Sequence, residues 1–199
     1  MLAKAFARTF LPAVAAALMF AAGGAQAILL NGTYTVTSNG NPLTGLAVGT
    51  LNDFGSVVNS TTNSFTGLNV PNTNTAIFRD MFDIFAIESP PYTGNDLVPQ
   101  PISIAFNFSS PGVRSAVFSG TTVGNAAGEG VLHWTSGPIT LLFPDFTRLT
   151  ITMADATFGD SFNGIVSAQF TAFVPEPGTL ALLGIGLLGA LSRRNRRSA

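Results

Sequence analysis

Apolar and polar residues alternate along most of the middle of the chain. In one such run Tyr34 and Val36 lie between Thr33, Thr35 and Thr37, and the run closes on the turn pair Asn-Gly. A period of two residues places the apolar side chains on one face of a β-strand and the polar side chains on the other. The run therefore predicts a half-buried strand followed by a turn.

Similar short runs recur along the chain, and most of them end at Gly, Pro, Asn or Asp. They span residues 45–51, 63–70, 101–110, 114–124, 130–137, 139–146, 148–159 and 164–174. Many short alternating strands with such turns are typical of two-layered antiparallel folds. The sequence thus predicts an all-β cargo domain over residues 28–173, either an antiparallel β-sandwich or a jelly roll.

Two neighbouring segments fit the alternation less well. In "TAIFRDMFDIFAIE" the residues Ile77, Met81 and Phe85 recur at helical spacing, whereas Phe82 and Ile84 alternate with their neighbours. We favour a strand here because the segment is rich in β-forming residues and lies among predicted strands. The proline-rich "SPPYTGNDLVPQP" that follows is predicted to be a loop, since proline is excluded from central strands.

The N-terminus has the three parts of a secretory signal peptide. Lys4 and Arg8 supply positive charge, an apolar run of about 13 residues follows, and Ala25 and Ala27 form a small-x-small cleavage site. The apolar run is short for a membrane helix, which needs roughly 20 residues. We expect signal peptidase to remove residues 1–27, in preference to the alternative of an N-terminal membrane anchor.

The C-terminus also has three parts in a fixed order. Pro175-Glu176-Pro177 precedes about 14 mostly apolar residues, Gly178 to Leu191, and a cluster of arginines follows. At about 1.5 Å per residue the apolar helix would reach about 21 Å, short of a hydrocarbon core of roughly 30 Å. The arginines would stay on the cytoplasmic side, so the preceding domain would face outward. They are Arg193, Arg194, Arg196 and Arg197.

This arrangement over residues 174–199 resembles the PEP-CTERM sorting signal. The resemblance implies recognition by an exosortase, a membrane-embedded, cysteine transpeptidase-like enzyme of Gram-negative bacteria. It also implies transient insertion in the inner membrane, cleavage near Pro175-Glu176-Pro177 and transfer to the cell surface or extracellular matrix. The alternative is a plain C-terminal anchor. The resemblance concerns where the protein is sorted, and it assigns no activity to the cargo domain.

The charge and the absence of cysteine exclude several classes of function for that domain. Between Ile28 and Val174 the only cations are Arg79, Arg114 and Arg148, against nine acids, which gives a net charge of about −6. Such a domain lacks the basic surface that binds nucleic acid. The chain has no cysteine, which excludes disulfides, thiolate zinc sites and a cysteine nucleophile.

One tryptophan, one tyrosine and one histidine are the candidate binding or catalytic groups. Trp134 is the only tryptophan and His133 the only histidine, and they are adjacent in a predicted strand. We favour core burial of Trp134, with stacking of Trp134 or Tyr92 on a sugar ring as the alternative. For His133 we favour a structural role, because one histidine without a Gly-x-Ser-x-Gly elbow is weak evidence for a catalytic triad.

Acidic pairs are the candidate metal ligands, and calcium is the cation they would suit. Asp155 and Asp160 flank a turn, and Asp80 and Asp83 lie close in sequence, but neither pair forms an EF-hand loop. We favour solvated surface acids, so the sequence assigns no metal site and no cofactor.

These features favour an exported surface or matrix protein with a structural or adhesive role in the envelope or biofilm, and without enzymatic activity. The main alternative is a module that binds exopolysaccharide through Trp134, Tyr92 or acids with calcium, and a hydrolase is a weaker one. Because lysine is absent from the domain, we also expect its strand edges to favour self-association.

Overall fold

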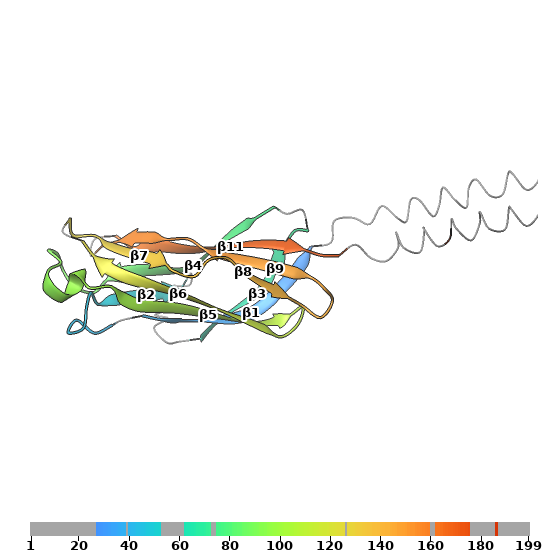
Figure 1. Ribbon diagram of the computed structural model, residues 1–199, viewed down its shortest axis with the longest axis horizontal. Helices are drawn as coiled ribbons and strands as arrows, with labels where there is room; N and C mark the ends of the chain where they lie inside the picture. The colour runs from blue at the N-terminus through green and yellow to red at the C-terminus, as the bar shows by residue number, and fades with distance from the viewer. Residues whose placement is uncertain are drawn as a thin grey trace, which may run out of the picture. The chain divides into compact units, whose positions relative to one another are not determined.

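The alternating runs form two antiparallel sheets in the computed structural model (Figure 1). The structure describes residues 27–38, 40–52, 62–72, 75–125, 127–159 and 162–175, together with Gly186. Residues 27–174 make up one compact unit, which corresponds to the predicted cargo domain. The predictions of a signal peptide and of a C-terminal helix fall outside the described residues.

Each sheet is built from strands that pair antiparallel. The order in the first, six-stranded sheet is β10 (Ala156–Phe158), β7 (Gly130–Trp134), β6 (Arg114–Gly124), β5 (Gln100–Ser110), β1 (Ile28–Thr37) and β3 (Thr62–Val70). The order in the second, five-stranded sheet is β2 (Val48–Asn52), β4 (Ile77–Ala86), β11 (Gly164–Phe173), β9 (Arg148–Met153) and β8 (Ile139–Leu142). The predicted all-β, antiparallel fold is confirmed, and β4 confirms the strand interpretation of the ambiguous segment.

One predicted run is divided between the two sheets. Residues 148–159 read as a single alternating run, but β9 belongs to the five-stranded sheet and β10 to the six-stranded one. The chain crosses from one sheet to the other at Ala154 and Asp155, which lie between the two strands. Alternation reports which side chains are buried, and in a sandwich both sheets bury their inner faces.

The proline-rich loop contains a short 3₁₀ helix, η1 (Gly94–Leu97), and ends inside a strand. Pro101 is the second residue of β5 and lies opposite Thr121 of β6. Pairing of β5 with β1 begins further along, at Ser103 opposite Thr37. The missing N–H of Pro101 therefore lies where β5 has a partner on one side, a position that tolerates proline.

Aromatic rings from both sheets pack together in the core. The Phe106 ring lies 6.1 to 6.3 Å, centroid to centroid, from the rings of Tyr34, Phe108, Phe118 and Phe170. Of these, Phe170 comes from β11 of the opposite sheet and meets Phe106 edge to face. The buried hydroxyl of Tyr34 also donates a hydrogen bond across the sandwich, to the backbone oxygen of Met81, at 2.5 Å.

Both ends of the domain lie at one end of the sandwich, which we call the proximal end (Figure 1). Ile28 pairs with Val70, the last residue of β3. Two residues later Asn72 exchanges two hydrogen bonds with the backbone of Val174, at 2.7 and 2.9 Å. The chain thus enters the sandwich at β1 and leaves it after β11 at the same end.

Replacing Phe106 by alanine should destabilise the domain strongly. The ring is fully buried among four others, so truncation removes apolar contacts and leaves a cavity. We expect a loss of about 3–5 kcal/mol in the free energy of unfolding, measured with urea. The matched control is Phe78→Ala on β4, where the ring is 71% exposed and the loss should stay below about 0.5 kcal/mol. Equal losses for the two variants would contradict this assignment of the core.

Candidate functional site

The residues of the two predicted signals lie mostly outside the described part of the chain. Ala27 and Pro175 are described and flank β1 and β11, whereas Ala25, Glu176, Pro177 and the four terminal arginines are not. Within the described residues, no helix has the length and apolar character needed to cross a membrane.

The rings proposed for sugar stacking are both buried, which corrects that hypothesis. Trp134 is 6% exposed and Tyr92 only 1%, so neither presents a face to a ligand. The indole N–H of Trp134 donates to the backbone oxygen of Ala154 at 3.0 Å. Tyr92 packs on β6 so closely that a Cβ at Gly124 would lie 2.8 Å from the Tyr92 Cβ. The favoured interpretation of Trp134 as a core residue is confirmed.

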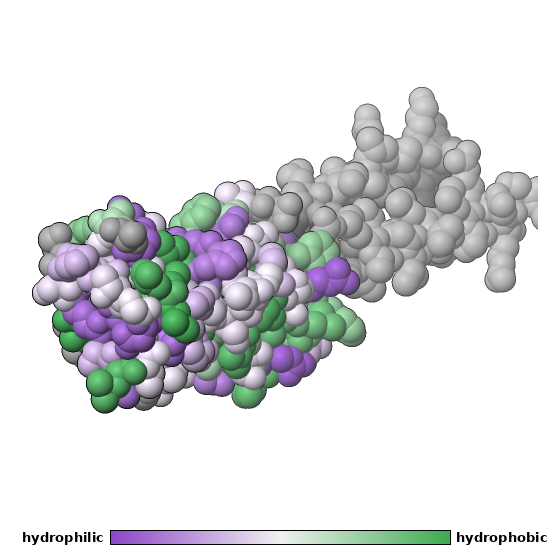
Figure 2. Space-filling model, turned by 60° about the vertical axis from the view of Figure 1, so that its left-hand side comes forward, coloured by the Kyte–Doolittle hydropathy of each residue, from purple (hydrophilic) through white to green (hydrophobic). Residues whose placement is uncertain are grey.

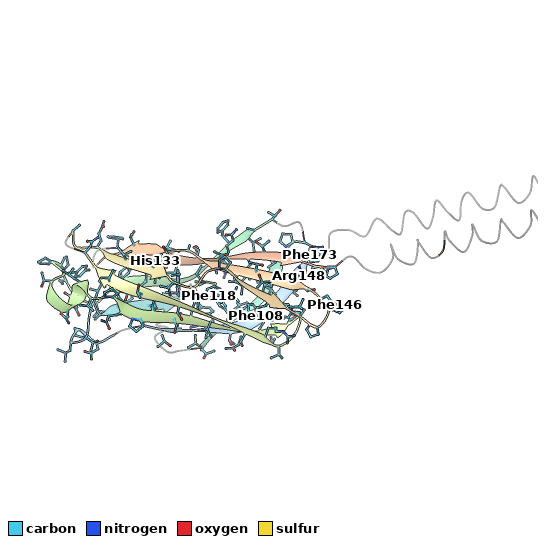
Figure 3. The ribbon with its side chains drawn as sticks, in the orientation of Figure 1. Phe108, Phe118, His133, Phe146, Arg148 and Phe173 are labelled. Carbon is cyan, nitrogen blue, oxygen red and sulfur yellow. The ribbon has the colours of Figure 1, made fainter. Side chains whose placement is uncertain are left out.

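His133 lies in β7, a strand as predicted (Figure 3). Its side chain is 66% exposed and is bound to the carboxylate of Asp155. The His133 Nδ1 lies 2.7 Å from Oδ2 of Asp155, and the other oxygen, Oδ1, accepts the backbone N–H of Trp134 at 2.8 Å. Burial raises the pKa of the Asp155 carboxyl, but the hydrogen bonds from Trp134 and His133 and the nearby imidazole outweigh it and lower that pKa.

This pair explains how the chain changes sheets. Asp155 and Ala154 form the crossover between β9 and β10, and both are tied to the end of β7. The sequence could suggest Asp155 only as one of many acids, because its partners lie more than twenty residues earlier. The geometry is that of a clamp between β7 and the crossover.

The acidic pairs considered as calcium ligands are used or placed differently. Asp80 accepts a hydrogen bond from Ser167 Oγ at 2.6 Å, and Asp160 lies outside the described residues. Among the residues that the structure describes, no group of three or more His, Asp or Glu side chains could hold a metal ion. Calcium binding by these pairs stays a prediction.

A different acidic pair, missed in the sequence, is formed by Glu88 and Asp96. Burial raises the pKa of the Glu88 carboxyl, and the charge and hydrogen bond of Asp96 raise it further, against the Ala47 N–H that donates to Glu88. Asp96 also accepts the backbone N–H of Thr93 at 3.1 Å in a capping box that begins η1. In the sequence, the Thr-x-x-Asp spacing of Thr93 and Asp96 is a signal for this capping box.

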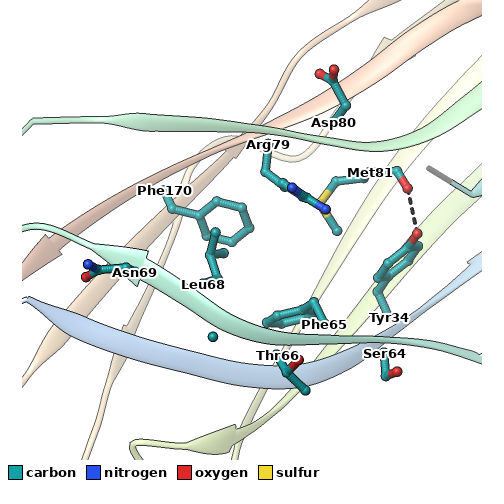
Figure 4. A pocket seen from close by; sticks show the side chains of 11 residues that line it. Tyr34, Ser64, Phe65, Thr66, Leu68, Asn69, Arg79, Asp80, Met81 and Phe170 are labelled. Atoms are coloured by element: carbon teal, nitrogen blue, oxygen red, sulfur yellow. Dashed lines mark hydrogen bonds between the residues drawn. The ribbon is translucent and has the colours of Figure 1, made fainter. Parts of the chain in front are cut away.

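A cleft of about 250 Å³ opens between β3, the last strand of the six-stranded sheet, and the part of β4 that lies beyond its pairing with β2 (Figure 4). Its walls are partly apolar, from Phe65, Leu68, Met81 and Phe170. Polar residues also line it: Ser64, Thr66, Asn69, Arg79 and Asp80. Asp80 points away from the cleft in Figure 4. The sequence could not reveal this site, because its residues come from four strands that belong to two different sheets.

Comparison with known proteins identifies the tail. Residues 173–197 match the family model described as the PEP-CTERM protein-sorting motif. The chain carries a PEP-CTERM motif. No curated protein and no solved structure matches the chain.

The match to the PEP-CTERM motif confirms the resemblance seen in the sequence and identifies the export pathway of the chain. It marks an exported protein that transits the membrane and is recognised by an exosortase at the cell envelope. The match begins at Phe173, the last residue of β11, so the motif follows the folded domain without an intervening linker.

Acid should weaken the clamp at Asp155. Its folded pKa lies below the unfolded value near 4, so its contribution to stability is present above that value and is lost as pH falls through the lowered pKa. We expect Asp155→Asn to lower the free energy of unfolding at pH 7 and to reduce its decline between about pH 5 and pH 2. Urea titrations at several pH values measure both effects. An unchanged decline in the variant would show that Asp155 makes no such contribution.

Proposed function

We propose that this protein is a structural or adhesive component of the envelope or biofilm matrix of a Gram-negative bacterium, released to that place by an exosortase. The PEP-CTERM motif is the observation that carries the proposal. The signal peptide predicted for residues 1–27 supplies the export step. In this proposal the domain acts by association and has no enzymatic activity.

The position of β3 at the edge of the six-stranded sheet, among the strands that the structure describes, supports an adhesive role. β3 ends the six-stranded sheet, and its nine residues, TNSFTGLNV, include no charge and no proline. Edge strands with such composition are open to pairing with a further strand. The cleft lies directly beside this edge and would receive an apolar side chain from an added strand.

The cleft also favours one alternative, binding of a carbohydrate. An apolar floor with an arginine and the Asn69 amide among its lining groups suits the mixed surface of a sugar ring. This version replaces the stacking on Trp134 and Tyr92. If binding of exopolysaccharide fragments, measured by calorimetry, were unaffected by Arg79→Ala, the alternative would fail.

Processing can be tested in the producing bacterium. Substituting Pro175 and Pro177 by alanine should trap the protein in the membrane fraction, because the exosortase would lose its recognition element. Cell fractionation measures the distribution. In a host that lacks the exosortase the wild type should be trapped equally, and the substitutions should add nothing. Normal release of the variant would contradict the proposal.

Self-association can be tested at the β3 edge. Thr66 is exposed on β3, and a lysine there would place a charge where an added strand must pair. We expect Thr66→Lys to reduce association of the exported protein in sedimentation velocity at high concentration. The control is Asn107→Lys, which adds the same charge to β5, a strand paired with both β1 and β6. A wild type that stays monomeric, or equal effects of both variants, would contradict a role for this edge.

A further inference from the structure

The proximal end of the sandwich has exposed apolar side chains next to arginines. Val113, Leu142, Phe146 and Phe173 are each at least half exposed. Figure 3 shows Phe146, Phe173 and Arg148 at this end of the domain. We call these four side chains, together with Arg114 and Arg148, the proximal tip.

Contacts between the hairpins hold the tip together. Arg114 Nε donates to the backbone oxygen of Leu142 at 2.7 Å, and its Nη1 donates to that of Val113 at 2.8 Å. The guanidinium carbon of Arg148 lies 5.9 Å from the centre of the Phe173 ring. The two arginines therefore lie among the apolar side chains and join the β5–β6 turn, the β8–β9 hairpin and the end of β11.

Phe146 occupies a position that does not suit its side chain. Its φ is 64°, in the left-handed region that favours glycine or asparagine and is unusual for a bulky residue. The ring is nevertheless 71% exposed, so packing in the core does not explain its presence. Both the backbone and the solvent would be served better by asparagine, which indicates that the ring has a contact outside the domain.

The two ends of the domain differ in charge. Arg114 and Arg148 are two of the three cations between residues 28 and 174, and Asp145 is the acid that lies beside them in the β8–β9 hairpin. The opposite end also exposes apolar residues, such as Leu43 and Leu97, but there they lie near Glu88 and Asp96. Figure 2, which brings that end forward, shows small hydrophobic areas divided by polar ones.

The residues that follow Val174 place an apolar stretch close to the tip. Only Pro175, Glu176 and Pro177 separate Val174 from the apolar stretch of the PEP-CTERM motif. A fully extended chain spans at most about 3.5 Å per residue, so Val174, which follows Phe173 of the tip, stays within about 14 Å of the start of that stretch. When the stretch is in the membrane, the end of the domain that carries Phe173 is therefore held close to the lipid headgroups.

We infer that the proximal tip is a lipid-contact surface that seats the domain on the outer face of the bilayer while the tail is inserted. Phe146, Phe173 and their apolar neighbours enter the interface, and Arg114 and Arg148 meet lipid phosphates. Seating the tip fixes the orientation of the domain and holds Pro175-Glu176-Pro177 at the membrane surface. The inference rests on the membrane-inserted intermediate of the proposed function.

Tryptophan fluorescence tests the inference, since the chain has one tryptophan and it is buried. Full-length Phe146→Trp is reconstituted at one chain per nanodisc containing phosphatidylethanolamine and phosphatidylglycerol. We expect a blue-shifted emission that lipids brominated near the headgroup quench, beyond the signal of Trp134 in the unsubstituted protein. The matched control, Leu43→Trp at the opposite end, should show neither effect.

Further arms separate the outcomes. Phe146→Asn should unfold at the same or a higher urea concentration than the wild type, as expected if the phenylalanine serves a contact outside the fold. A clear loss of stability would overturn that part of the argument. Absence of quenching at position 146, or quenching only when several chains share a disc, would overturn the lipid contact and favour a second copy as the partner. No exosortase is present, so failure of the processing proposal leaves these results unaffected.

Discussion

Packing of aromatic rings between the two sheets is the contact on which the rest of the structure depends. Phe106 meets rings of its own sheet and, through Phe170, a ring of the opposite sheet. The Tyr34 hydrogen bond to Met81 joins the sheets a second time. With few charges in the domain, surface ion pairs contribute little, and burial of the apolar core to which these rings belong supplies most of the stability. The same packing leaves β3 as a free edge and opens the cleft beside it.

This core also decides where the chain leaves the domain. The first residue of β1 and the last residue of β11 both lie at the proximal end. Hydrogen bonds between Asn72 and Val174 join the end of β11 to the end of β3. The PEP-CTERM motif begins at the last residue of β11, so the sorting motif is joined directly to a paired strand. The free edge and the cleft, along the side of the sandwich, remain for other contacts.

Much of the fold could be predicted from the sequence, because side chains alternate between core and solvent along each strand. β5, β6 and β11 all follow that pattern. The assignment of strands to sheets could not be predicted, as β9 and β10 show, since both sheets bury the same kind of residue. The tail was recognisable because its three parts are contiguous. The clamp of Asp155 on His133 and the cleft were not, because their residues meet only after folding. Burial of Tyr92 could not be predicted either, because it depends on packing against Gly124, which is distant in sequence.

In the proposal made above, the protein functions as the folded domain without its two terminal signals. Intact-mass measurement of the protein isolated from the surface or matrix of its producing bacterium tests this most directly. The account predicts a chain that begins at Ile28, ends near Pro175-Glu176-Pro177 and lacks the terminal arginines. A surface protein that retains Arg193 to Arg197 would contradict it.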